Sequence, residues 1–200
     1  MNGYSDRINH ALAFAAKHHD QQVRRGTRAP YVTQPANLAV ILTRYGRDED
    51  TVTAAILLEV VADHARQGSS REWLAQRIGE KFGERVLELS LAASERATDD
   101  DGAPLSPEER RADRLDRIAG VPAEVHWLVA AEALHASGTL LADLRRTVDP
   151  ASVWSRLATG RERTVAVFRH LHARLVETGF DTPIVAELGG IVGALERWPD

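Results

Sequence analysis

Hydrophobic residues recur along this chain at intervals of three and four. Two such runs are Ile8, Leu12, Ala15 and Ala16, then Phe82, Val86, Leu89 and Ala93. This spacing places apolar side chains on one face of an α-helix, and few segments alternate over the length of a strand. The pattern predicts an all-α helical bundle of roughly ten helices, with little or no sheet.

Helix starts are marked by a capping residue followed by proline. Ser106 precedes Pro107, and the same signature occurs at Asp149-Pro150 and Thr182-Pro183. A capping side chain accepts a backbone N–H of the first turn, where proline has no hydrogen bond to lose. The last of these signals predicts a helix over residues 183–198. Its apolar residues suit a dimer face or the last core helix, and we favour the core.

One segment lacks any apolar periodicity. Residues 94–105 contain three consecutive aspartates, a glycine and a proline. The helices on either side have the pattern of one bundle. We therefore expect a mobile loop inside a single domain of residues 1–200, rather than a linker between two domains.

Composition narrows the class of protein. With 44% hydrophobic and 27% charged residues, the 200-residue chain is globular rather than disordered. Its net charge of -4 argues against a general nucleic-acid or membrane-surface binder. Because there is no cysteine, disulfides and thiolate chemistry are excluded, which suits the cytoplasmic location that we expect. No secretory leader or membrane span is visible in the sequence.

Residues 51–63 are apolar on nearly every side, which predicts a helix at the centre of the bundle. Glu59 lies in the middle of this helix, and Asp63 follows four residues later on the same face. A buried carboxylate needs a cation or a hydrogen-bond donor, or else its pKa rises. The two acids are either a structural pair bridged to arginines elsewhere or the mark of a functional polar site.

Five segments then carry a family pattern, in one order and spacing. They are AFAAKHHDQQVRRG with APYVTQPANLAV (13–40), ILLEVVAD (56–63), FGERVLEL (82–89), AEALHA (131–136) and WSRLATGRE (154–162). Together they resemble the HD domain of the RelA/SpoT homologues and the small alarmone hydrolases, over most of residues 8–178. The resemblance implies an all-α HD-domain bundle. It also implies descent from enzymes that remove the 3′-pyrophosphate of ppGpp with a Mn²⁺-type ion.

The residues that the resemblance places at the metal site have changed. The family's first histidine falls on Gln34, its His-Asp pair on Leu58 and Glu59, and its later aspartate on Glu132. Leucine cannot ligate a metal and an amide oxygen is a neutral donor. We therefore expect no metal cofactor at the family position. The alternative is Mn²⁺ or Mg²⁺ held by the two glutamates.

Other positions keep more of the family pattern. Of the acidic pair that assists the water, only Asp63 is kept, and no further catalytic residue is identified. Arg24 matches an arginine beside the nucleotide, with Arg25 next to it, and His19 matches a histidine of the pocket wall. The ligand pocket that we expect comprises His19, Arg24, Arg25, Gln34, Leu58, Glu59, Asp63 and Glu132. The arginines either bind phosphate or a base, or neutralise Glu59 or Asp63.

Three functions fit these observations. The leading hypothesis is a degenerate HD domain that has lost hydrolysis and binds a guanine nucleotide, another phosphorylated molecule or a partner in the remnant cleft. The first alternative is an active phosphoester hydrolase in which Glu59, Asp63 and Glu132 form a rebuilt carboxylate metal site. The second is a structural or homodimeric protein without a small-molecule ligand.

Overall fold

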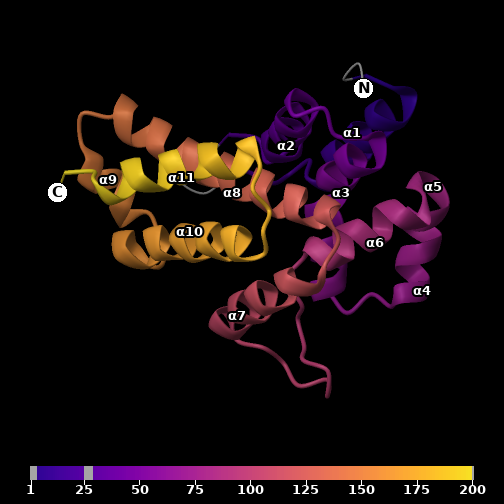
Figure 1. The fold of residues 1–200 in the computed structure, drawn as a ribbon. Helices are drawn as coiled ribbons and strands as arrows, with labels where there is room; N and C mark the ends of the chain where they lie inside the picture. Colours follow the sequence, from indigo (N-terminus) through magenta and orange to yellow (C-terminus); the bar gives the residue numbers. More distant parts are fainter. Residues whose placement is uncertain (1–3, 25–28, 200) are drawn as a thin grey trace.

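The computed structural model describes residues 4–24 and 29–199. In chain order the α-helices are α1 (Asp6–His18), α2 (Thr33–Arg44), α3 (Glu49–Arg66), α4 (Arg71–Leu74), α5 (Glu80–Phe82), α6 (Glu84–Ala93), α7 (Pro107–Arg117), α8 (Ala123–Arg146), α9 (Pro150–Ser155), α10 (Gly160–Glu177) and α11 (Pro183–Glu196). Within the described residues, β structure is limited to two isolated bridges. The prediction of an all-α fold is confirmed (Figure 1).

Helix α3 is the central element of the bundle. It packs against α1, α2, α6 and α8. From Thr51 to Ala62 every residue except Glu59 is buried, as its apolar sequence predicts. Asp48 caps the helix and accepts the N–H of Thr51 at 3.0 Å. The packing of α3 therefore fixes the carboxylate of Glu59 inside the protein.

Helix α8 connects two groups of helices. Figure 1 shows it extending from the group around α3 to the group formed by α9, α10 and α11. Five apolar residues of α11 are buried against this second group and α8, namely Ile184, Val185, Leu188, Val192 and Leu195. No described helix combines the length and apolar content needed to cross a membrane.

The helix predicted through Phe82 and Ala93 is interrupted, so that prediction is wrong in its continuity. Helix α5 ends at Phe82 and α6 begins at Glu84, with Gly83 between them at φ 102°. This backbone conformation is accessible mainly to glycine. Phe82 and Ala93 are nevertheless buried in the same core.

Two of the three predicted caps form. Ser106 and Glu109 exchange hydrogen bonds in a capping box, and Asp149 accepts the N–H of Ser152 at 3.3 Å. Thr182 precedes α11 but makes no capping hydrogen bond, and its hydroxyl is buried without a partner among the described residues. Proline alone therefore marks the start of α11.

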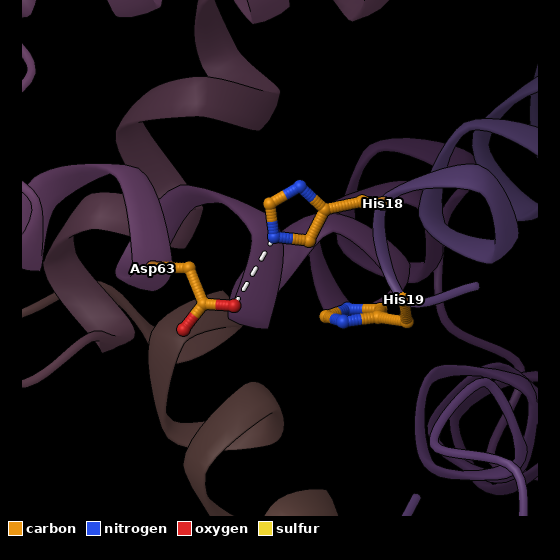
Figure 2. Close-up of side chains that lie close together, drawn as sticks. All are labelled: His18, His19 and Asp63. Carbon is orange, nitrogen blue, oxygen red and sulfur yellow. Dashed lines mark hydrogen bonds and ion pairs between the residues drawn. The ribbon is translucent and has the colours of Figure 1, made fainter. Parts of the chain in front are cut away.

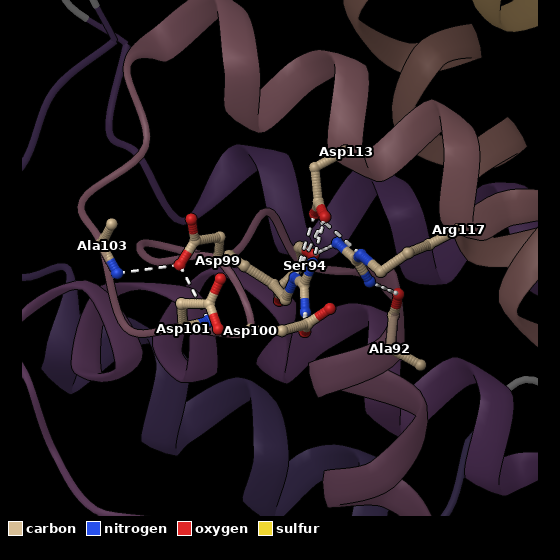
Figure 3. Close-up of polar contacts among 9 residues, drawn as sticks. Ala92, Ser94, Asp99, Asp100, Asp101, Ala103, Asp113 and Arg117 are labelled. Carbon is tan, nitrogen blue, oxygen red and sulfur yellow. Dashed lines mark hydrogen bonds and ion pairs between the residues drawn. The ribbon is translucent and has the colours of Figure 1, made fainter.

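The segment between α6 and α7 is held at several points. Asp99 accepts two backbone N–H groups of its own turn, at 2.8 and 3.0 Å. Arg96 donates to Asp113 on α7. Arg117 donates to the same carboxylate (Figure 3). Arg117 also donates to backbone carbonyls at the end of α6, at 2.8 and 3.1 Å. These contacts tie the base of the loop to α7, which lines the polar cavity described next.

Candidate functional site

A polar cavity of about 160 Å³ lies where α3 and α8 meet. Glu59 of α3 and Glu132 of α8 both line it. The other lining residues are Leu58, Ala62, Arg66, Ala93, Ser94, Glu95 and Arg114. The structure therefore brings together three of the residues that the resemblance places around the metal: Leu58, Glu59 and Glu132.

Each glutamate in this cavity has an arginine partner. Arg114 from α7 donates a hydrogen bond to Glu132. Arg66 lies with Nη2 3.5 Å from Glu59 Oε2, and it also donates to Asp63. The interpretation of the acids as pairs bridged to arginines is therefore supported. Among the described residues, the ion-pair partner of Glu59 and Asp63 is Arg66 and not Arg24.

Burial and nearby charges raise the pKa values of Glu59 and Tyr31. Burial raises the pKa of Glu59, and the nearby carboxylate of Glu132 raises it further, against the attraction of Arg66 and Arg114. Burial likewise raises the pKa of Tyr31, and the charge of Glu59 adds to this effect. The Tyr31 hydroxyl therefore stays protonated near neutral pH.

These residues do not fit the metal ion of the family. Leu58 is buried and offers no donor atom. Glu132 already binds the guanidinium of Arg114, which supplies the positive charge that an ion would bring. Gln34 is half-buried at the start of α2 and does not line this cavity. The alternative of Mn²⁺ or Mg²⁺ on Glu59 and Glu132 meets the same obstacle, because a cation is already present.

Arg24 lies at a second, larger cavity of about 330 Å³. This cavity is formed by α8, α9 and α10, and its lining residues are Arg24, Ala136, Thr139, Leu140, Asp143, Val153, Arg156, Leu157, Ala158, Thr164 and Phe168. Among the described residues no acid forms an ion pair with Arg24. Arg25, the other predicted pocket arginine, lies outside the described residues.

The charge of Arg24 acts on a neighbouring histidine. His135 is buried, and its Nε2 has no hydrogen-bond partner in the described part of the chain. Burial lowers its pKa to about 4, and the positive charge of Arg24 adds to this shift. His135 is therefore neutral at pH 7 and contributes no charge to this region.

His19 and Asp63 belong to a third place, at the end of α1. His18 Nε2 lies 3.1 Å from Asp63 Oδ2 (Figure 2), and His19 Nδ1 lies 2.9 Å from Gln22 Oε1. Burial lowers the pKa of His19. For Asp63 burial acts to raise the pKa, but the hydrogen bonds from His18 and Arg66 outweigh it and lower the pKa.

The residues expected to form a single pocket are thus divided among three neighbouring regions. Glu59 and Glu132 share the first, Arg24 lines the second, and Asp63 lies in the third. Sequence reasoning missed Arg66, Arg114 and His18 as partners. Arg114 is one of several arginines in α7 and nothing in its local sequence distinguishes it. His18 carried a usable signal, since it ends the helix beside His19.

Comparison with known proteins identifies the family of this chain. Residues 11–121 match the HD domain family. A stretch of 86 residues is 34% identical to the guanosine-3′,5′-bis(diphosphate) 3′-pyrophosphohydrolase of Aquifex aeolicus (strain VF5). This match covers 43% of the present chain and 11% of that enzyme.

Solved structures share the fold. A metazoan ortholog of SpoT that hydrolyses ppGpp superimposes with a TM-score of 0.73 at 22% identity, over 96% of each chain. A protein of Listeria monocytogenes EGD-e superimposes with a TM-score of 0.65 at 23% identity, over 84% of this chain and 98% of the other. With its helical bundle and its match over residues 11–121, this chain belongs to the HD domain family.

Proposed function

We propose that this chain is an HD domain that binds a guanine nucleotide, or a closely related phosphorylated molecule, without the family's metal-dependent hydrolysis. The observation that carries the proposal is the ion pair between Arg114 and Glu132. It occupies the cavity in which the resemblance places the metal-binding acids.

The chemistry of this ion pair argues against hydrolysis. A metal ion activates water as a Lewis acid, by lowering the pKa of a bound water toward 7. A guanidinium can bind a phosphate but offers no empty orbital for water. Leu58 leaves a second requirement unmet, because a hydrocarbon side chain stands where an imidazole would hold the ion. The cavity thus keeps its charge and loses the groups that would generate a nucleophile.

The cavity at Arg24 has the properties of a nucleotide site. Its volume of about 330 Å³ suits a base with part of its sugar. The hydroxyls of Thr139 and Thr164 donate to backbone carbonyls of their own helices, so they offer acceptor oxygens to a ligand. Arg24 forms no ion pair among the described residues, although Asp143 also lines the cavity. Its guanidinium can stack on a base or bind a phosphate through two parallel hydrogen bonds. The Aquifex relative is a guanosine-3′,5′-bis(diphosphate) 3′-pyrophosphohydrolase, and the SpoT ortholog hydrolyses ppGpp.

Calorimetric titration of the full chain with GDP and with ppGpp tests the proposal. We expect binding by the unmodified protein and at least a tenfold loss in Arg24→Ala, since a charge-assisted contact is removed. Arg145→Ala is the matched control, because Arg145 is exposed on α8 and does not line the cavity. Absence of heat with either nucleotide would favour the structural or homodimeric alternative.

A further inference from the structure

We propose that His18, His19 and Asp63 form a site for a divalent transition metal ion of the Zn²⁺ type, separate from the position at which the family holds its metal. One ring nitrogen of each histidine and one carboxylate oxygen of Asp63 all lie within 4.8 Å of one another. Figure 2 shows the three side chains around a common space. Two imidazoles and one carboxylate are a donor set found in catalytic zinc sites.

The end of α1 brings the two histidines together. Helix α1 ends at His18, and His19 caps it with its N–H bonded to the carbonyl of Ala15. The two imidazole rings are nearly perpendicular, with their centroids 4.7 Å apart. His18 reaches across to Asp63 on α3, which packs against α1. Ligands from two packed helices need little rearrangement to close on an ion.

His19 is already oriented as a metal-binding histidine. Its Nδ1 donates to the amide oxygen of Gln22 at 2.9 Å, which leaves a lone pair on Nε2. Histidine ligands usually have their second ring nitrogen held in this way, because it fixes the orientation of the ring. His19 is only 2% exposed, and its Nε2 has no hydrogen-bond partner in the described part of the chain. A metal ion would satisfy this buried acceptor.

The other two ligands are partly engaged and still available. Asp63 uses one carboxylate oxygen for Arg66 and directs the other to His18. An ion would take the place of the proton between His18 and Asp63, so the contact with Arg66 is kept. Because Arg66 already orients the carboxylate, Asp63 is a prearranged ligand.

Three protein ligands leave a coordination position open, and His18 also lines a cavity of about 360 Å³. The remaining lining residues are Phe14, Lys17, His64, Trp73 and Arg77. With Lys17 and Arg77 as its cations, this cavity suits a small anion as the additional ligand. None of the three proposed ligands lines the cavity at Arg24, so the metal site and the nucleotide proposal stand independently.

The test is direct metal binding by the full chain, prepared without a polyhistidine tag and stripped by a chelator. Calorimetry should show one Zn²⁺ per chain with micromolar or tighter affinity, and Co²⁺ should give the visible absorption of a four-coordinate ion. His18→Gln, His19→Gln and Asp63→Asn should each weaken binding by about tenfold or more. His10→Gln, an exposed histidine on the same helix, should leave the affinity unchanged.

Circular dichroism and thermal unfolding of each variant identify any loss of fold. Gln22→Leu provides a second variant that keeps all three ligands, and a weakening of about tenfold is expected there. Absence of Zn²⁺ binding by the unmodified chain would overturn the proposal. So would binding that all three ligand substitutions leave intact. Zn²⁺ binding and nucleotide binding are measured in separate titrations, so failure of one proposal is distinguishable from failure of the other.

Discussion

The guanidinium of Arg114 donates to the carboxylate of Glu132 inside the cavity where the resemblance to HD hydrolases places a metal ion. The two side chains come from α7 and α8, and both are largely shielded from water. An arginine at this point keeps the acidic wall of the cavity neutralised without a metal. This relationship is the structural basis for proposing a domain that retains the fold and lacks the family's hydrolytic chemistry.

Removing that arginine should destabilise the protein. Arg114→Met leaves the carboxylate of Glu132 without its cation beside Glu59, and we expect the free energy of unfolding to fall by about 2 kcal/mol. This value is below that of a fully buried pair, because the side chains of Arg114 and Glu132 remain 15% and 25% exposed. Urea denaturation measures the change. Adding Glu132→Gln should recover most of the lost free energy of unfolding. Unchanged stability in Arg114→Met alone would show that the ion pair with Glu132 does not stabilise the fold.

Glu59 should make the stability depend on pH. The pKa of Glu59 is raised in the folded protein above its ordinary value of 4.5. As pH rises above 4.5, Glu59 therefore ionises less readily in the folded protein than in the unfolded chain. Its contribution to stability is therefore present at low pH and is lost as pH rises through the folded pKa. Glu59→Gln removes this loss, so the variant should gain stability relative to the unmodified chain as pH rises above 4.5. A difference that does not change with pH would contradict the raised pKa.

His135 should act in the opposite direction. Its pKa is about 4 in the fold, against 6.5 ordinarily, so between these values the unfolded chain takes up a proton that the fold does not. The stability is complete above pH 6.5 and falls as pH is lowered toward 4, by at most about 3 kcal/mol. Urea denaturation of His135→Gln should show a flatter dependence over this range. Arg24→Ala should reduce the slope as well, because its charge contributes to the shift.

Gly83 should resist substitution. Its φ of 102° is unfavourable for any residue with a side chain, and a Cβ there would lie 3.0 Å from Nη2 of Arg7. We expect Gly83→Ala to lower the free energy of unfolding by about 1–2 kcal/mol. Gly120→Ala is the matched control, because a Cβ at that position meets no atom within 4 Å. Equal thermal stability of the two variants would show that the turn between α5 and α6 adapts.

Much of the fold can be predicted from local pattern. The apolar run of α3 predicts a buried central helix because few other environments accommodate hydrophobic residues on every side. Ser106 and Asp149 predict helix starts because a capping side chain acts within its own turn. The break at Gly83 is harder to predict, since glycine is tolerated in helices and only the backbone conformation shows that this one ends the helix.

The partners of the buried acids could not be predicted in the same way. The need for a cation near Glu59 follows from its burial, but several arginines could satisfy it. Arg114 is selected by a tertiary contact, because its side chain in α7 reaches Glu132 in α8 across 18 residues of sequence. His18 and Asp63 are likewise 45 residues apart and meet only because α1 packs on α3. Such choices depend on tertiary geometry, which local periodicity does not determine.

The most direct test of the central claim is release of pyrophosphate from ppGpp by the purified full chain in the presence of Mn²⁺. We predict no release of pyrophosphate above that of buffer with the same ion. Leu58 offers no ligand atom, and the carboxylate of Glu132 is paired with Arg114. Mn²⁺-dependent release that is lost in Glu59→Gln, with the fold intact, would contradict the account. It would show instead that the carboxylates have rebuilt a working metal site.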